Sequence, residues 1–241
     1  YYNCAYEWYL HYLECNRSEN SFFGEYGSLI HKILEKYANE ELSLFELNQY
    51  YEENFNDFIL HDAPPNQYVD IRQSYYDKGV EYLNNIDLDL EKYEILGVEK
   101  EVHFKIEDKD FIGYIDLLVK DKDTEENIII DHKSSNIKVL KNGSVSKSDQ
   151  QHFLEFKRQA YLYSIPIIKE YGRVSKLMWN IFKDRKWIEI TWKQEECDEA
   201  VQWAKDTLEL IKNESLWLPN PDYYYCNYLC GQRNNACEYK P

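Results

Sequence analysis

A carboxylate and an ammonium group end a strongly apolar segment of this chain. The stretch IIIDHK places three isoleucines directly before Asp131, and His132 and Lys133 follow. Because side chains alternate between the two faces of a β-strand, Asp131 and Lys133 point one way and His132 points the other. Charges at the end of a buried strand are costly unless something compensates them. The pattern is typical either of a solvated strand end with an incidental ion pair or of half of a metal-dependent active site.

A second carboxylate interrupts another apolar segment. Asp116 lies in the stretch FIGYIDLLV, where a charge is usually paired or bound to a metal. Aspartates on successive strands can converge on Mg²⁺ or Mn²⁺, which accept carboxylate oxygens and water. Beside such an ion, Lys133 could orient or help deprotonate an attacking water and offset the charge of a scissile phosphate. His31, on the apolar side of a predicted helix, could be a further ligand or an ordinary core histidine.

The elements that must position these residues follow from hydrophobic periodicity. Residues 2–90 read as helical, and Ser28 is the predicted N-cap of the helix that carries His31. Two strands are predicted within 93–121, joined by a turn at 107–108, and further strands over 128–133, 174–182 and 186–192. Helices are predicted over 149–171 and 194–213. The tail after Leu218 shows neither the helical nor the strand period of apolar residues, so we expect it to fray unless it is cross-linked.

These elements predict an α/β fold in which helices flank a mixed sheet. No linker separates two units, so we expect one domain over 1–241. It would consist of a helical part (1–90), a catalytic core (91–214) and a tail (215–241).

The composition limits the classes of partner. The formal net charge is −16, from 44 acidic and 28 basic residues, so long-range electrostatics oppose indiscriminate coating of nucleic acid. The stretch 132–158 reverses the balance, with six basic residues against two acidic ones. Within it, Lys138, Lys141 and Lys147 could hold a phosphate backbone or only solvate a loop. Neither a membrane-spanning run nor a secretory signal is visible, so a cytoplasmic location without membrane attachment is expected.

Several motifs together resemble a known family. GYID, which ends at Asp116, is followed 15 residues later by DHK, similar to the paired motifs of the PD-(D/E)XK nuclease superfamily. GSLIHKILE resembles the G-x-x-x-H helix of the RecB-type branch, and QAYLY resembles its Q-x-x-x-Y motif. The latter places Gln159 and Tyr163 on one helical face. The resemblance spans nearly the whole chain, from Cys4 to Cys237.

The resemblance implies a restriction-endonuclease-like fold and a site for Mg²⁺ or Mn²⁺. The implied metal ligands are His31, Asp116, Asp131 and the backbone carbonyl of His132. Asp131 stands where many members have glutamate, which shortens the reach toward the metal by one methylene.

The resemblance also implies roles for residues around the metal. Lys133 would be the catalytic lysine, and Gln159 and Tyr163 would lie near the substrate, although Tyr163 also falls on the apolar stripe of its helix. Glu99 and Glu101, on the preceding strand, are either accessory acids or ordinary charges on the strand surface.

Four cysteines predict a cross-link between the two ends of the chain. Cys226, Cys230 and Cys237 lie in CNYLCGQRNNAC, and Cys4 lies near the other end. Such a set could bind zinc, bind an iron–sulfur cluster or form disulfides. The layout resembles that of cluster-bearing RecB-type nucleases, such as AddB-like and CRISPR-adaptation enzymes, and therefore implies a [4Fe–4S] cluster. The chain departs from this layout in two ways: Ala5 stands in place of a proline, and each gap between the C-terminal cysteines is one residue longer.

The function that these features predict is a metal-dependent DNA exonuclease that carries a structural iron–sulfur cluster. Its substrate would be the end of single- or double-stranded DNA. The protein could also form an oligomer or act with a helicase or recombination partner. The alternatives are a non-catalytic nucleic-acid-binding or assembly module with the same fold, and a nuclease stapled by zinc.

Overall fold

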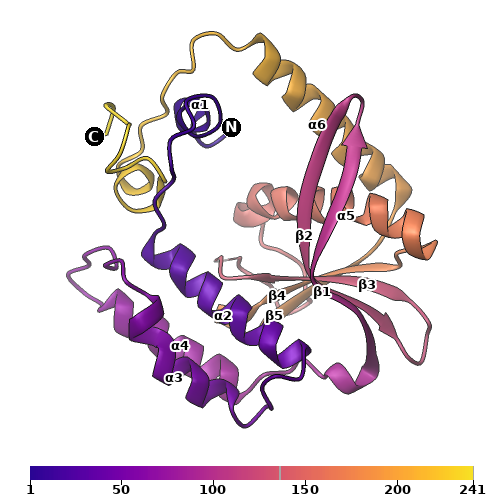
Figure 1. Ribbon diagram of the computed structural model, residues 1–241. Helices are drawn as coiled ribbons and strands as arrows, with labels where there is room; N and C mark the ends of the chain where they lie inside the picture. The colour runs from indigo at the N-terminus through magenta and orange to yellow at the C-terminus, as the bar shows by residue number, and fades with distance from the viewer. Residues whose placement is uncertain (136, 241) are drawn as a thin grey trace.

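A five-stranded mixed sheet forms the centre of the molecule (Figure 1). The computed structural model describes residues 1–135 and 137–240. Across the sheet the strands follow chain order: β1 (Tyr93–Ile106), β2 (Lys109–Asp121), β3 (Asn127–Lys133), β4 (Lys176–Ile181) and β5 (Lys186–Thr191). β3 and β4 pair in parallel, and the other neighbours pair antiparallel. The mixed sheet predicted from the sequence is confirmed.

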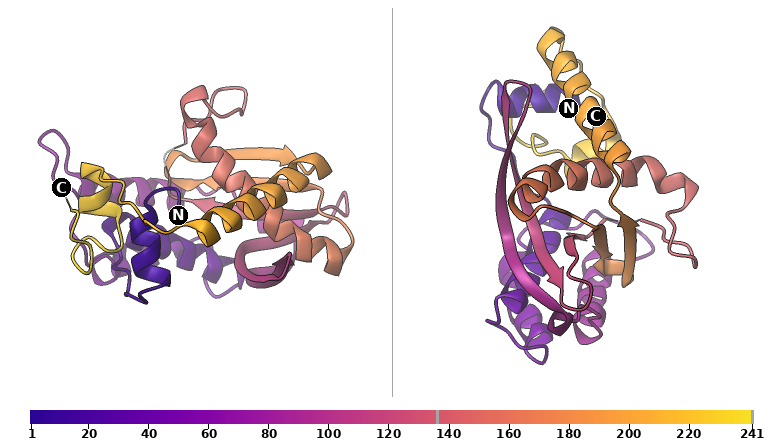
Figure 2. Two further views of the ribbon diagram at one scale, coloured as in Figure 1. Left: turned by 90° about the horizontal axis from the view of Figure 1, so that it is seen from above. Right: turned by 90° about the vertical axis from the view of Figure 1, so that its right-hand side faces the viewer.

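Helices cover both faces of the sheet, which explains the unbroken run of isoleucines in β3 (Figure 2). On one face lie α5 (Gln150–Tyr171) and α6 (Gln194–Asn213), packed on Ile129. Ile128 and Ile130 point to the other face, where α2 (Phe22–Ala38) contributes Ala38 to the core. α3 (Leu47–Phe58) and α4 (Ile71–Asn84) pack behind α2. A strand buried on both faces has no polar face to present until it reaches its end.

The helix that carries His31 begins earlier than predicted. Its N-cap is Ser21, whose hydroxyl accepts a hydrogen bond from the backbone N–H of Gly24 at 3.1 Å. The predicted cap, Ser28, lies inside the helix. The helical pattern therefore extends through FFGEYGS, because small residues within it do not interrupt a helix that is packed on its neighbours.

β2 and β3 separate at the point where the two aspartates occur. Their pairing runs from Lys120 opposite Asn127 to Leu117 opposite Ile130, and Asp116 and Asp131 are the next residues on each strand. Beyond this fork, β2 continues with β1 alone as a long twisted hairpin (Figure 1). The ladder between the two strands therefore ends just before both carboxylates.

The tail is anchored by polar contacts to the first residues of the chain. The Glu7 carboxylate, in α1 (Ala5–Tyr12), accepts hydrogen bonds from Tyr225 Oη at 2.6 Å and from the Gly231 backbone N–H at 2.7 Å. Gln232 is fully buried, and its side chain donates to the carbonyls of Asn16 and Arg17 at 3.5 and 3.3 Å. The tail therefore buries polar side chains against the start of the chain, although its sequence shows neither a helical nor a strand period.

Among the described residues, none of the helices combines the length and apolar character needed to cross a bilayer.

Candidate active site

Asp116 is the central carboxylate of the fork. Its Oδ2 accepts a hydrogen bond from the backbone N–H of His132 at 2.6 Å, and its Oδ1 lies 3.5 Å from His31 Nδ1. His31 reaches this point because α2 packs closely on the end of β3. A Cβ at Gly27, one turn before His31, would lie 3.1 Å from the Ser134 hydroxyl. The glycine of the G-x-x-x-H pattern thus lets the helix approach the strand.

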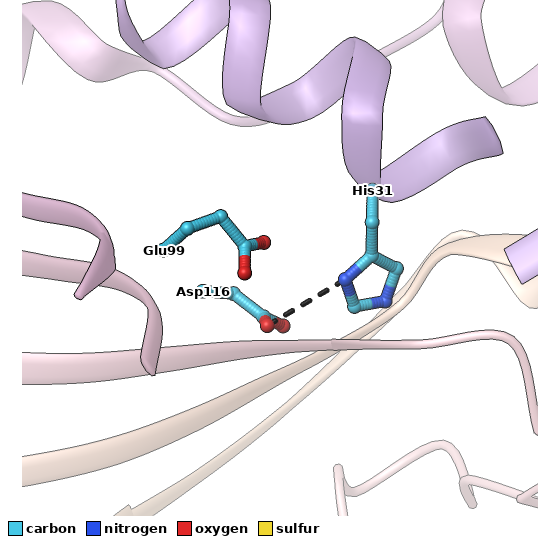
Figure 3. Close-up of side chains that lie close together, drawn as sticks. All are labelled: His31, Glu99 and Asp116. Carbon is cyan, nitrogen blue, oxygen red and sulfur yellow. Dashed lines mark ion pairs between the residues drawn. The ribbon is translucent and has the colours of Figure 1, made fainter. Parts of the chain in front are cut away.

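Glu99 joins His31 and Asp116, as Figure 3 shows. One atom from each of these three side chains lies within 4.8 Å of the other two. Ligands of a single Mg²⁺ ion, with bonds of about 2.0–2.1 Å, lie within about 4.2 Å of one another. A modest inward movement of the side chains would therefore let them share one cation. This was the only such group of three among the residues that the structure describes.

Strand register places Glu99 beside Asp116. Val98 pairs with Leu117 and Lys100 with Ile115, so Glu99 lies opposite Asp116, and it adopts a left-handed backbone with φ of 46°. Such a backbone is costly for a residue other than glycine and recurs at functional sites. The sequence offered Glu99 only as an accessory acid or a surface charge, because charged residues on an ordinary strand point to solvent.

Lys133 lies between Asp131 and α5. Its Nζ is 3.1 Å from Asp131 Oδ1, 2.9 Å from Asp131 Oδ2 and 3.1 Å from Gln159 Oε1. Gln159 in turn donates to Tyr163 Oη at 3.2 Å, and the ammonium lies 4.8 Å from the centre of the Phe156 ring. The lysine, the glutamine and the tyrosine singled out in the sequence thus form one continuous chain of contacts.

The charges of the site are unequally stabilised. Burial opposes ionisation of Asp116, but the hydrogen bond and charge of His31 outweigh it and lower the pKa of Asp116 to about 2. Burial also tends to lower the pKa of His31, yet its contact with Asp116 and the nearby charges of Asp131 and Glu99 raise that pKa overall. His31 and Asp116 therefore stabilise each other as an ion pair.

The negative charges of the other two carboxylates are less fully compensated. Burial and the charge of Asp116 raise the pKa of Asp131 to about 6, against the attraction of Lys133. Burial and Asp116 also raise the pKa of Glu99. Asp131 Oδ2 is buried, and the Lys133 ammonium, 2.9 Å away, is its ion-pair partner. A divalent cation would stabilise the ionised forms of Asp131 and Glu99, so the residues present fit a metal.

The His132 ring lies on the opposite face of β3 from Asp131 and Lys133, with its centre 5.9 Å from that of the His31 ring. The imidazole is buried, its Nδ1 lies 3.1 Å from Asn180 Nδ2, and burial lowers its pKa to about 4. The imidazole is therefore neutral at ordinary pH, and His132 contributes to the site through its backbone.

The metal set is accessible from outside. A cavity of about 480 Å³ adjoins it, lined on the α2 side by Gly24, Ser28, His31 and Lys32 and on the sheet side by Glu99.

Comparisons with known proteins agree with this geometry. The sequence matches the profile of the PD-(D/E)XK nuclease superfamily over residues 1–241. The chain belongs to this superfamily. The chain shares its fold with a solved protein from Eubacterium rectale described as a "Putative exonuclease", with 15% identity and a TM-score of 0.52. That match covers 99% of this chain and 83% of the other. No curated protein matches the sequence. The predicted restriction-endonuclease-like fold is confirmed.

The lysines predicted to contact DNA lie on the surface of the protein, between β3 and α5. Lys138, Lys141 and Lys147 are all exposed. In the described part of the 132–158 stretch, ion pairs instead involve other basic residues, Lys133, Lys157 and Arg158.

The four cysteines occupy the region where the tail meets α1. All carry free thiols. Cys4 Sγ accepts a hydrogen bond from the Glu7 backbone N–H at 3.5 Å, and Cys230 Sγ accepts one from Gln232 at 3.4 Å. Burial raises the pKa of the Cys237 thiol, and the neighbouring Cys4 and Cys226 raise it further.

Proposed function

We propose that this member of the superfamily is a Mg²⁺- or Mn²⁺-dependent DNA exonuclease of the RecB-type branch. The observation that carries the proposal is the position of Lys133. Its ammonium is fixed between Asp131 and Gln159, beside a fork that holds His31, Glu99 and Asp116.

Each residue then has a distinct task in phosphodiester hydrolysis. Asp116, Asp131, His31 and the His132 carbonyl would hold the ion, and Glu99 would complete the set. A bound Mg²⁺ or Mn²⁺ supplies water activation and polarisation of the phosphate.

The Lys133 ammonium would orient the attacking water and offset the charge that develops on the phosphate. Gln159 fixes the direction of the ammonium, and Tyr163 fixes Gln159 through its own hydrogen bond. Because the ammonium is already ordered, it does not have to reorient when charge develops on the phosphate. Its contact with that charge therefore stabilises the transition state more than the same contact would in water.

The exonuclease mode is supported by the RecB-type motifs and by the description of the Eubacterium rectale neighbour. The rival assignment is a non-catalytic nucleic-acid-binding module, which would not require Asp116 and Asp131 to lie at the same place in the sheet. Asp116 and Asp131 instead follow the last paired residues of β2 and β3, which favours catalysis.

The test uses end-labelled single- and double-stranded DNA with Mg²⁺, with Mn²⁺ or with EDTA. We expect shortening from the ends that EDTA abolishes. Asp116→Ala, Asp131→Ala and Lys133→Ala should each remove it while the thermal transition persists. Asp123→Ala, at an exposed turn, is the matched control and should remain active. Wild-type cleavage by any of the three site variants would refute the assignment.

We further propose that Cys4, Cys226, Cys230 and Cys237 bind a [4Fe–4S] cluster with a structural role. Backbone N–H groups directed at Cys4 and Cys230 suit thiolate ligands, because hydrogen bonds to sulfur tune such clusters. A closed zinc site has bonds of about 2.3 Å and sulfurs about 3.8 Å apart. No three described cysteine sulfurs lie within 4.8 Å of one another, which favours a larger group over one zinc ion.

Protein purified without oxygen should be brown, with about four irons and four acid-labile sulfides per chain. Cys→Ala at any of the four positions should give colourless protein. One zinc and no iron would establish the zinc-stapled alternative.

A further inference from the structure

The outward face of the β1–β2 hairpin carries exposed apolar side chains next to the fork. Ile112 and Tyr114 on β2 are 55% and 51% exposed, whereas Gly113 and Ile115, which alternate with them, are buried. Side chains two residues apart on a strand share a face. Tyr114 therefore lies on the same face as Asp116, about 6.8 Å along the strand.

The ring of Tyr114 is held in place although it is exposed. Glu101, directly opposite on β1, accepts a hydrogen bond from Tyr114 Oη at 2.9 Å through Oε2. The other oxygen of Glu101 lies 2.7 Å from His103 Nε2. Glu101 is thus engaged with its neighbours rather than with the metal set, and it orients an aromatic ring one step away from that set.

We propose that Tyr114 is a positioning residue that stacks on a base of the DNA strand at or next to the scissile phosphate. The inference rests on the proposed nuclease function. A half-exposed aromatic ring beside a phosphate site provides a stacking surface, and such stacking tolerates any sequence because every base has a π face. Fixing the ring in advance lowers the entropy lost when the base is bound.

The substrate form follows from the same geometry. Within a duplex each base is already stacked on its neighbours, so a base is free for Tyr114 only in an unpaired strand or a frayed end. The DNA expected at the site is therefore one with an unpaired base, in a single strand or at a frayed duplex end.

The test compares Tyr114→Leu, Tyr114→Phe and Tyr68→Leu with the wild type on a short single-stranded oligonucleotide. Base–aromatic stacking has a typical strength that corresponds to a KM increase of about 5- to 150-fold on loss of the ring. We expect Tyr114→Leu to show this increase with kcat little changed. Tyr114→Phe should keep most of the affinity, because it keeps the ring. Tyr68, 84% exposed in the segment between α3 and α4, is the matched control and should have no effect.

A second arm removes the base instead of the ring. Single abasic nucleotides placed at successive positions should identify one position at which the wild type loses affinity and Tyr114→Leu loses none further. Equal KM values for Tyr114→Leu and the wild type, or additive losses at every abasic position, would overturn the stacking role while leaving the nuclease assignment intact. Failure of the wild type to cleave any DNA with Mg²⁺ or Mn²⁺ would instead refute the proposed function, and this inference with it.

Discussion

Glu99 and Glu101 are two residues apart on β1, yet they have different neighbours. Glu99 faces His31 and Asp116, whereas Glu101 pairs with Tyr114 and His103. Strand register produces this difference, because Glu99 lies opposite Asp116 and Glu101 lies opposite Tyr114. The left-handed φ of Glu99 is costly for a residue other than glycine, and it persists where the surroundings enforce it.

The first prediction separates these two acids. Glu99→Gln removes one charged ligand from the metal set, so the Mn²⁺ concentration for half-maximal cleavage should rise about 10- to 100-fold. Titration calorimetry with Mn²⁺ alone should show the same weakening. Glu101→Gln, the matched variant, should leave Mn²⁺ binding unchanged. Equal metal affinities for Glu99→Gln and the wild type would exclude Glu99 from the ligand set.

Much of the site could be predicted because its charges occur where apolar residues should continue. Asp116 and Asp131 interrupt buried strands, and the Gln159–Tyr163 spacing places both side chains on one helical face. Glu99 could not be recognised in this way, because its position opposite Asp116 depends on the register between β1 and β2. The orientation of Tyr114 likewise depends on strand register, which pairs it with Glu101.

At the scale of elements, the hairpin is packed directly against α5. A Cβ at Gly113 of β2 would lie 2.2 Å from the Tyr163 ring. Tyr163 contacts Gln159, which contacts Lys133. The absence of a side chain at Gly113 therefore determines how closely the hairpin approaches the helix that orients the catalytic lysine.

The second prediction tests this contact. Gly113→Ala should displace the Tyr163 ring, cost about 1–3 kcal/mol of the free energy of unfolding, and lower kcat because Gln159 loses its support. Denaturant titrations give the first quantity and single-turnover kinetics the second. In a double variant with Tyr163→Leu, the added methyl group should cost less stability than it does alone. Additive losses would show that Gly113 and Tyr163 do not compete for space.

The third prediction concerns Lys183, a buried lysine after β4. It is 6% exposed, and its Nζ contacts Tyr75 Oη at 3.0 Å. Burial, assisted by Lys78, lowers its pKa to about 8. The native state therefore binds fewer protons than the unfolded chain between about pH 8 and 10.5, so this lysine makes stability rise with pH in that window.

Below pH 8 the buried charge opposes folding. Lys183→Met should therefore raise the free energy of unfolding at pH 7, by about 3 kcal/mol at most, and this gain should shrink as the pH approaches 10. Denaturant midpoints at pH 7 and 9.5 check the prediction, with Lys141→Met as the exposed control. A gain that is the same at both pH values would show that improved packing, rather than charge, is its cause.

At the scale of the whole molecule, a net charge of −16 must be reconciled with a DNA substrate. Overall repulsion is screened beyond about 8–10 Å at physiological ionic strength. A local group of exposed lysines can therefore act on phosphates independently of the distant acids. The loop with Lys138, Lys141 and Lys147 lies in the segment that leads from Lys133 to α5.

The fourth prediction follows from this separation. Replacing the three lysines together with serine should reduce the slope of log affinity against log salt by about 2 for single-stranded DNA, at about 0.7 for each phosphate contact. Turnover at saturating DNA should change little, because these lysines are apart from the metal set. Binding assays between 50 and 200 mM salt measure the slope. An unchanged slope would mean that these lysines serve only to solvate the loop.

The order of the elements was also largely predictable. Three elements agree with their predicted bounds to within one residue: α5 (149–171 predicted), α6 (194–213) and β3 (128–133). The apolar pattern is clear in these elements because β3 is buried on both faces and each helix is buried along one stripe. The tail was not predictable, since its order depends on Glu7, Gln232 and their partners more than 200 residues away.

The hydrogen bond between the Gly231 backbone N–H and Glu7 has a consequence for biosynthesis. A ribosome adds about 5–20 residues per second, so the partners of Glu7, 224 residues further along, follow it by roughly 10–45 s. During this interval α1 has no docking surface, whereas α2, the sheet and the metal ligands can already assemble. Chaperone binding to the nascent chain should therefore concentrate on α1, and it should end only when the last residues of the tail are released.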